Sequence, residues 1–223
     1  MPLKPAQPPQ PVTLEGRYCR LEPMADSHAA DMYAAISGPE MEARHRYLGN
    51  LTPPADLAGL RDWIIKANAS PEWVYFSVID NNTGRCGGRQ AFMRIRPEHA
   101  SIEIGGVLWG EGVARTRIAT EAFYLMAKHV FEDLGYRRFE WKCHNENLPS
   151  KKAAQRFGFT FEGIFRQDQI IRGQNRDTAW FSMLDKEWPA IKVAFETWLA
   201  PENFDEYGQQ KVALRTPASV PAP

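Results

Sequence analysis

The turn between residues 109 and 117 combines features that suit a phosphate-rich ligand. A predicted strand ends at Trp109, and an apolar pattern with helical spacing starts near Thr116 or Arg117. Free amides at a helix N-terminus favour anions, and the guanidinium groups of Arg115 and Arg117 stand where the chain turns. This combination could hold a pyrophosphate. The alternative is a solvated loop with two surface arginines.

A second candidate segment, residues 145–159, places polar side chains at another expected helix start. Asn147 and Ser150 precede Ala153-Ala154, and the segment continues to Arg156-Phe157-Gly158-Phe159. Taken alone, Asn147 is an ordinary N-cap and Ser150 its capping partner.

Composition limits the classes of function. The chain has 223 residues, with 27 basic and 27 acidic side chains, and this neutral balance argues against a dedicated nucleic-acid binder. An apolar fraction of 43% supports a sizeable core and excludes disorder throughout. Residues 115–156 nevertheless contain nine basic and five acidic residues, so an anionic partner agrees with the neutral total.

Neither metal nor membrane signals are present in the sequence. Cys19, Cys86 and Cys143 have no close spacing, which favours buried thiols over a disulfide framework or a zinc site. No apolar run approaches the ~18 to 20 residues of a membrane span, and the N-terminus lacks the pattern of a secretion signal. We expect a cytoplasmic protein.

The order of predicted elements indicates an α+β fold with a single mixed, mostly antiparallel sheet flanked by helices. No internal repeat is visible. The expected strands are 12–22, 73–80, 87–96, 101–109, 138–143, 159–171 and 178–184, and the expected helices are 26–36, 53–67, 116–134, 149–157 and 188–199.

Proline marks the two ends of the chain. Five of the 17 prolines lie within residues 1–11 and three within the last seven residues. Because proline lacks the amide that helices and central strands require, we expect tails at 1–11 and 201–223 around one domain at 12–200.

Together, in this order, the two candidate segments resemble the GNAT superfamily of acyl-coenzyme A-dependent N-acyltransferases. The Asn147-x-x-Ser150 pair followed by Gly158-Phe159 is similar to its second motif, and residues 118–122 are similar to the helix after its pyrophosphate loop. Asp177, the strand 180–184 and Glu187-Trp188 resemble the Rim-type branch, which includes ribosomal-protein N-terminal acetyltransferases. The resemblance spans residues 12–188 and implies the GNAT fold.

The pyrophosphate loop departs from the family pattern, which is Arg or Gln, two residues, Gly, one residue, then Gly or Ala. Aligned on residues 118–122, Gly112 takes the first position, and Arg115 and Arg117 stand where small residues are common. We expect the backbone of this loop to be less free to adopt positive φ than the usual one. Its phosphate binding should then rely on guanidinium groups and on amides in ordinary conformations.

The resemblance implies roles for particular residues. Ser150 would lie near the sulfur, and we expect it to protonate the leaving thiolate while the amide near Val107 polarises the carbonyl. Glu103 is the expected base, through water if needed, because it sits on the strand that leads to the acyl site. For Glu103 the alternative is a strand-face or salt-bridged carboxylate, and His45 and His144 rank below it. The implied cofactor-binding residues are Gly106, Val107 and Leu108 for pantetheine, Arg115, Thr116, Arg117, Ile118 and Ala119 for pyrophosphate, Asn147 for the pantetheine arm and Ser150 near the sulfur.

Substrate selection is expected outside the cofactor motifs, with cleft walls that include Tyr47, Trp73, Phe76, Arg166 and Asp177. Asp177 could attract an amine cation, although Asn175-Arg176-Asp177 is also good turn chemistry.

The resulting hypothesis is an acetyl-CoA-dependent N-acetyltransferase that works by direct attack in a ternary complex, without a metal. The acceptor would be a primary amine on a small molecule or a protein N-terminus, with no nucleic-acid or membrane partner, and homodimer formation stays open. The alternative is a coenzyme A-binding regulatory module without turnover. Arg115 and Arg117 favour that alternative, whereas Asn147 and Ser150 disfavour it.

Overall fold

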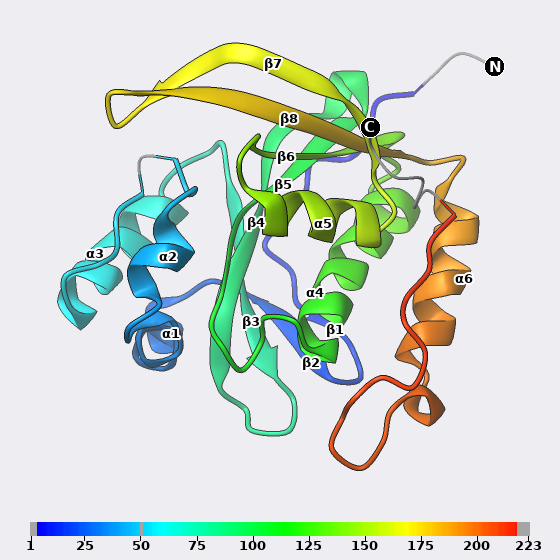
Figure 1. Cartoon of the computed structure of the whole chain (residues 1–223), viewed down its shortest axis with the longest axis horizontal. Helices are drawn as coiled ribbons and strands as arrows, with labels where there is room; N and C mark the ends of the chain where they lie inside the picture. Colours follow the sequence, from blue (N-terminus) through cyan, green and yellow to red (C-terminus); the bar gives the residue numbers. More distant parts are fainter. Residues whose placement is uncertain (1–3, 50, 218–223) are drawn as a thin grey trace.

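The computed structural model describes residues 4–49 and 51–217, which form an eight-stranded sheet with helices on both faces (Figure 1). The strand order is β1-β2-β3-β4-β5-β6-β8-β7, and of the neighbouring pairs only β5 and β6 are parallel. This confirms the α+β class and the mixed, mostly antiparallel sheet. The strands are β1 Leu14–Glu15, β2 Cys19–Pro23, β3 Val74–Asp80, β4 Cys86–Arg96, β5 Ser101–Trp109, β6 Arg138–His144, β7 Thr160–Ile171 and β8 Gln174–Leu184. The helices are α1 Ala29–Ile36, α2 Met41–His45, α3 Leu57–Asn68, α4 Arg117–Lys128, α5 Leu148–Arg156 and α6 Trp188–Leu199.

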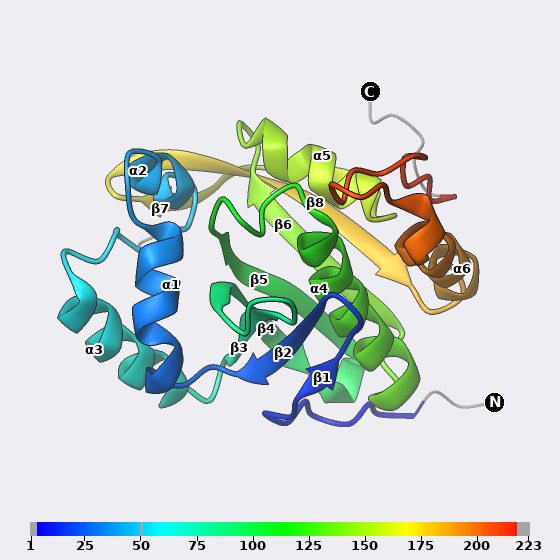
Figure 2. The ribbon, with the colours of Figure 1, turned by 90° about the horizontal axis from the view of Figure 1, so that it is seen from below.

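Each face of the sheet has its own hydrophobic core. Figure 2 shows α1 and α3 on one side of the sheet, with α4 and α6 on the other. Because strand side chains alternate between faces, Tyr75 packs in the α1–α3 core and its neighbour Phe76 in the α4–α6 core. None of the helices in the described ranges is both long and apolar enough to cross a membrane.

The expected first strand, residues 12–22, is broken into the hairpin β1–β2. The cause is Glu121 of α4, whose buried carboxylate accepts backbone amides from Arg17 at 2.8 Å, Tyr18 at 2.6 Å and Cys19 at 2.7 Å. A Cβ on Gly16 would lie 2.7 Å from Glu121 Cδ, so the turn requires glycine. This contact ties the N-terminal hairpin to the start of α4.

Helix α4 begins where its N-cap predicts. The hydroxyl of Thr116 accepts the amide of Ile118 at 3.1 Å, and the helix continues beyond Lys128 as a π-helical turn, His129–Asp133. Gly135, with φ of 73°, follows this turn at the position expected for a C-terminal cap.

Strands β5 and β6 separate part of the way along their length, and this separation positions the site. Their pairing runs from Ser101–Arg138 to Ile104–Trp141 and stops there. Beyond it, β5 pairs only with β4, and β6 pairs only with β8. The facing backbone edges of both strands are therefore free of sheet partners over the second half of β5.

Both ends of the described chain pack on this fold. The amide of Ala6 donates to Pro97 O at 2.9 Å, and that of Gln7 to Leu134 O at 2.8 Å, so part of the expected N-terminal tail is pinned to the domain. At the other end, Phe204 and Leu214 are buried, which corrects the expectation that the chain after residue 200 forms a separate tail. Residues 1–3 and 218–223 of those expected tails lie outside the described part.

Candidate functional site

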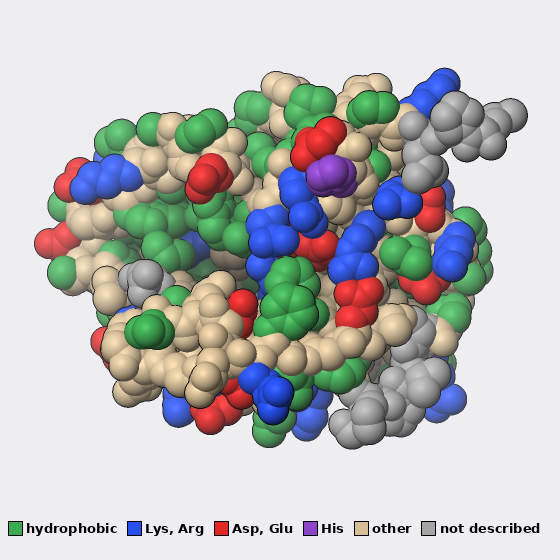
Figure 3. Space-filling model, turned by 90° about the horizontal axis from the view of Figure 1, so that it is seen from above, with side chains coloured by type: hydrophobic (Ala, Val, Ile, Leu, Met, Phe, Trp, Pro, Cys, Tyr) green, Lys and Arg blue, Asp and Glu red, His purple; other side chains and the backbone are tan. Residues whose placement is uncertain are grey.

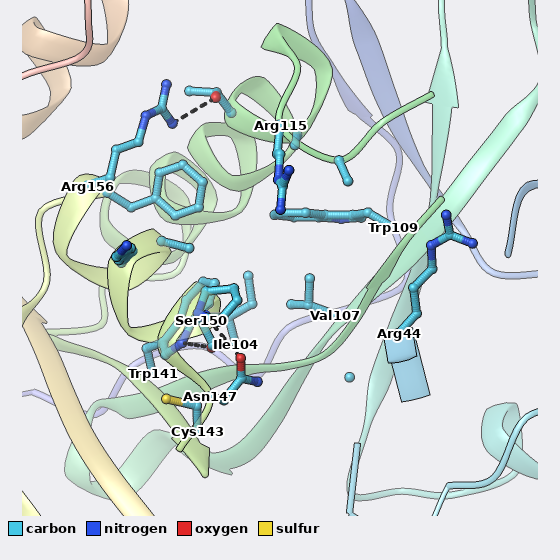
Figure 4. A pocket seen from close by; sticks show the side chains of 18 of the residues that line it. Arg44, Ile104, Val107, Trp109, Arg115, Trp141, Cys143, Asn147, Ser150 and Arg156 are labelled. Carbon is cyan, nitrogen blue, oxygen red and sulfur yellow. Dashed lines mark hydrogen bonds between the residues drawn. The ribbon is translucent and has the colours of Figure 1, made fainter. Parts of the chain in front are cut away.

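One pocket of about 1220 Å³ extends through the gap between β5 and β6 (Figure 4). On the α4 side it is lined by the 112–120 segment and by α5, and on the other side by residues of α2, β3 and the β7–β8 hairpin. Pockets that bind one drug-sized ligand measure roughly 300 to 1,000 Å³, so this pocket is large enough for a large ligand together with a second small molecule.

The N-terminus of α4 presents unbonded amides to the pocket. The backbone amides of Arg115, Arg117 and Ala119 have no hydrogen-bond partner among residues 4–49 and 51–217. Arg115 has φ of 65°, although it is not glycine. This corrects our expectation that the loop keeps ordinary conformations, because the left-handed backbone is adopted despite a cost of roughly 1 to 2 kcal/mol. Strain of this kind persists where the surroundings enforce it, and here it turns the chain into the helix N-terminus.

Four basic side chains surround this part of the pocket: Arg115, Arg117, Lys152 and Arg156. Across the described ranges, none of the four is within ion-pair distance of a carboxylate. The Arg117 guanidinium lies over the rings of Tyr18 at 4.4 Å and Phe204 at 5.3 Å. These cations are therefore available to an anionic ligand.

Arg156 is held beside α4 by its contacts. It donates to Thr120 Oγ1 at 3.0 Å and lies over the Trp198 ring at 4.9 Å. Burial lowers the pKa of Arg156, and a phosphate placed beside it would offset that cost. In Figure 4, Arg156 and Arg115 occupy the same end of the pocket.

Asn147 and Ser150 both line the pocket at the gap between the strands. Asn147 caps α5 by accepting the Ser150 amide at 3.2 Å. Trp141 Nε1 donates to Ser150 Oγ at 3.0 Å, so the hydroxyl proton of Ser150 is free to be donated elsewhere. Cys143 lies close to this hydroxyl and lines the same pocket (Figure 4).

A buried arginine shapes β5 next to this point. Gly106 has φ of 59°, and its carbonyl accepts from Arg89 Nη1 at 2.5 Å. A Cβ on Gly106 would approach Arg89 and Tyr75 to 3.2 Å and Trp73 to 3.3 Å, so both the backbone angle and the space require glycine. Burial lowers the pKa of Arg89 to about 10, which still leaves the guanidinium charged near neutral pH.

Glu103 lies deeper on the same strand and has an unusual protonation equilibrium. It is 3% exposed, and burial raises the pKa of its carboxyl to about 7, although Lys142 opposes the shift. Lys142 Nζ lies 2.9 Å from its Oε2 and Arg94 Nε lies 3.4 Å from the same atom. The carboxylate of Glu140 stands directly across the parallel pair and raises this pKa further. A carboxyl that titrates near neutrality in a pocket can accept a proton.

Several expected site residues line this pocket: Tyr47, Trp73, Glu103, Gly106, Val107, Arg115, Thr116, Arg117, Ile118, Ala119, Asn147 and Ser150. Phe76 and Leu108 do not, because their side chains are buried in the two cores. Trp73 directly precedes β3 and stacks on Tyr75, whereas Phe76 faces the opposite side of the sheet.

Arg166 and Asp177 also lie outside the pocket lining, contrary to our expectation of cleft walls. The Asp177 carboxylate accepts the Gln167 amide at 2.8 Å and Asn175 Nδ2 at 2.9 Å, and thus serves the turn chemistry of the hairpin. The neighbouring Arg176 lines the pocket instead.

Neither of the two histidines considered as bases lines the pocket. His45 is 3% exposed with Nδ1 2.8 Å from Met41 O, and burial lowers its pKa. His144 accepts the amide of Glu146 at 3.1 Å and packs against Tyr47.

The sequence interpretation missed one wall of the pocket. Phe204 and the 207–210 segment line it beside Arg117. The signal was weak: an aromatic pair, Phe204 and Tyr207, in a segment beyond the last helix. Lys142 and Arg89 were also missed, because their roles depend on which strands lie side by side.

Figure 3, which looks from above, shows a hollow walled mainly by hydrophobic side chains, beside a band of Lys and Arg side chains over the middle of that face. The pocket lining itself combines basic side chains at the start of α4 with apolar and aromatic ones, among them Tyr47, Trp73 and Met93, on the opposite side.

Comparison with known proteins agrees with this geometry. Residues 19–160 match the family model of the acetyltransferase (GNAT) domain. The chain is similar to the uncharacterized N-acetyltransferase p20 of Bacillus licheniformis, with 32% identity over 146 residues, covering 62% of this chain and 79% of that one.

Solved structures show the same relationship. A GCN5-related N-acetyltransferase from Brucella melitensis is 52% identical, with a TM-score of 0.92 over 95% of this chain and 96% of that one. RimL, a ribosomal L7/L12 α-N-protein acetyltransferase solved in complex with coenzyme A, is 18% identical and shares the fold, with a TM-score of 0.64 over 78% of this chain and 98% of that one. The chain belongs to the GNAT family of acetyl-CoA-using N-acetyltransferases, within its Rim-like group.

Proposed function

We propose that this N-acetyltransferase moves the acetyl group of acetyl-CoA to a primary amine by direct attack in a ternary complex. One observation carries the proposal: the gap between β5 and β6 opens a single pocket that both Ser150 and Glu103 line, with basic side chains at one end. Bound acetyl-CoA would supply the reactive thioester.

The residues fit this co-substrate. Unbonded amides at the start of α4 and the unpaired guanidinium of Arg115 suit its pyrophosphate. The free edge of β5 at Val107 suits the amides of the pantetheine arm, as a strand edge suits any extended peptide-like chain. The capping role of Asn147 uses its Oδ1 and leaves its Nδ2 able to donate.

Two side chains divide the proton transfers. Glu103 takes a proton from the attacking amine, directly or through water, because its pKa near 7 matches the operating pH of a general base. Ser150 gives its hydroxyl proton to the leaving thiolate, since its oxygen already accepts from Trp141. Solvent water then returns a proton to Ser150 and takes the proton held by Glu103, which restores both groups. The Val107 amide, next to the carbonyl that Arg89 holds in place, polarises the thioester carbonyl.

The test is a thiol-release assay with acetyl-CoA across a panel of primary amines, with initial rates measured while both substrates vary. A ternary complex gives intersecting lines in the double-reciprocal plots, and acetyl-CoA alone leaves the protein mass unchanged. Parallel lines together with an acetylated protein would show a covalent route, for which Cys143 beside Ser150 is the available nucleophile. Binding of acetyl-CoA without thiol release from any amine would favour the regulatory module instead.

A further inference from the structure

We propose that the amine acceptor carries a carboxylate, which Arg44 and Arg176 bind in the half of the pocket lined by α2, β3 and the β7–β8 hairpin, called here the acceptor half. This inference rests on the proposed acetyl transfer, because it concerns the second substrate of the same site.

Arg176 lies on the same face of the sheet as the proposed base. Arg176, Thr178 and Trp180 alternate along β8 and so share one face. The ring of Trp180 packs under Lys142 at 4.6 Å, and Lys142 pairs with Glu103 at 2.9 Å. Arg176 therefore lies on the same face as this cluster, four residues from Trp180 towards the hairpin tip, where it lines the pocket.

Arg44 belongs to the opposite wall. It is part of α2, and its Nη1 reaches Ile36 O at 3.4 Å, at the end of α1. In Figure 4 it lies across the pocket from Asn147 and Ser150, well away from Arg156. The acceptor half thus has one guanidinium from the helical side and one from the β7–β8 hairpin.

Neither guanidinium has an ion-pair partner within the part of the chain that the structure describes. Glu103 is the single carboxylate that lines the pocket among these residues, and Lys142 and Arg94 already pair with it. No acidic group there remains for an acceptor with a second positive charge. The charge of Arg89, buried behind Gly106, adds to the positive potential.

Apart from the Glu103–Lys142 pair and Gln169, the rest of the acceptor half is largely apolar or aromatic. Tyr47, Trp73 and Met93 line it, and the Trp73 ring stacks on Tyr75 at 5.3 Å. Guanidinium groups bind carboxylates through paired hydrogen bonds, which adds orientation to attraction. An acceptor with an apolar body, a primary amine and a carboxylate fits both features, as in a hydrophobic amino acid or a short peptide with a free C-terminus.

The experiment compares matched acceptors at saturating acetyl-CoA. The pairs are L-phenylalanine with 2-phenylethylamine, L-leucine with isoamylamine, and Ala-Phe with its C-terminal amide. We expect a kcat/KM at least about tenfold higher for at least one carboxylated member than for its partner, the size of one charge-assisted hydrogen bond. Arg176→Gln and Arg44→Gln should each remove most of this advantage by raising the KM of the carboxylated amine, while the neutral amine and the Kd of acetyl-CoA change less than about twofold. Arg176→Lys should restore part of it.

Arg166→Gln is the matched control, because Arg166 is on the same hairpin but outside the pocket lining, and it should leave the preference unchanged. Failure to bind acetyl-CoA, or to acetylate any primary amine, would defeat the proposed function itself. Two results would overturn this inference but leave the proposed function intact. One is acetylation with no advantage for the carboxylated amines, and the other is arginine variants that slow both members of a pair equally. If the acetyl-CoA-bound protein acetylates none of these amines, the affinity of each amine is measured by calorimetry with the same pairs. Equal affinity for the carboxylated and neutral members also overturns the inference.

Discussion

Replacing Glu103 by Gln removes the proposed base while keeping the size of the side chain. The carboxyl is 3% exposed, and burial holds its pKa at about 7 instead of the usual 4.5. From this value, roughly one-tenth of the protein carries the ionised base at pH 6 and roughly nine-tenths at pH 8. The contribution of Glu103 to the rate should therefore rise about ninefold between these pH values.

The assay is kcat/KM for one amine in the wild-type protein and in Glu103→Gln, measured from pH 5.5 to 9. The amine's own ionisation affects both proteins, so it cancels in the ratio of their rates. We expect the ratio to reach at least about 100 at pH 8, the lower range for a positioned base, and to fall about ninefold at pH 6. A ratio that stays constant across this range would refute the role of Glu103.

Glu140→Gln is the matched control. Glu140 stands opposite Glu103 in the strand register and is equally buried, but it does not line the pocket. Its charge raises the pKa of Glu103, so its removal should move the midpoint of the rate profile to lower pH without abolishing the rate.

The same equilibrium affects folding. A carboxyl whose pKa is raised in the folded state disfavours folding once it ionises, so its cost appears as pH rises from about 4.5 through 7. The difference of about 2.5 between the two pKa values corresponds to about 3 kcal/mol. The unfolding free energy of Glu103→Gln relative to wild type should therefore increase by about this amount from pH 4 to pH 8, as measured by denaturant unfolding.

Three further variants test other parts of the site. Ser150→Ala should lower kcat roughly 100-fold with little change in the KM of acetyl-CoA; an unchanged rate from mildly acidic to alkaline pH would contradict the acid role. Arg115→Gly should weaken acetyl-CoA binding roughly five- to tenfold in calorimetry, even though glycine suits a φ of 65°. Equal affinity of the variant and the wild-type protein would show that backbone amides alone bind the pyrophosphate here. Tyr207→Ala should weaken acetyl-CoA binding about fivefold without lowering Tm, because Tyr207 is 80% exposed yet lines the pocket. The control is Val212→Ala, which is exposed but outside the pocket and should bind acetyl-CoA normally. Equal affinity of the two variants would show that the 207–210 segment is not part of the site.

The elements that the sequence predicts are those whose apolar residues recur at a regular spacing. The apolar residues of α4 recur at helical spacing, and its Thr116 cap marks the start, so the helix and the adjacent loop were predicted together. The five-residue α2 was not predicted, because a helix this short carries little periodic signal. The break between β1 and β2 depends on Glu121, about 100 residues away, which no local pattern reveals.

The site was predicted where its residues belong to one segment and missed where distant strands create it. Asn147 and Ser150 sit on one turn, so their spacing alone indicated the motif. The raised pKa of Glu103 comes from burial and from the parallel register that places the Glu140 carboxylate beside it, while Lys142 opposes the shift. Arg176 lines the pocket in place of the expected Asp177, because neighbouring residues of a strand face opposite sides. A difference of one residue thus decides whether the acceptor meets a positive or a negative side chain.

Calorimetric titration of the purified protein with acetyl-CoA tests the central claim most directly, namely that the gap between β5 and β6 holds this co-substrate. We predict one site per chain with a Kd in the micromolar range, and at least tenfold weaker binding for Gly106→Val, whose side chain would meet Arg89, Tyr75 and Trp73 at a φ of 59°. No heat of binding at millimolar acetyl-CoA, or wild-type affinity in Gly106→Val, would contradict it.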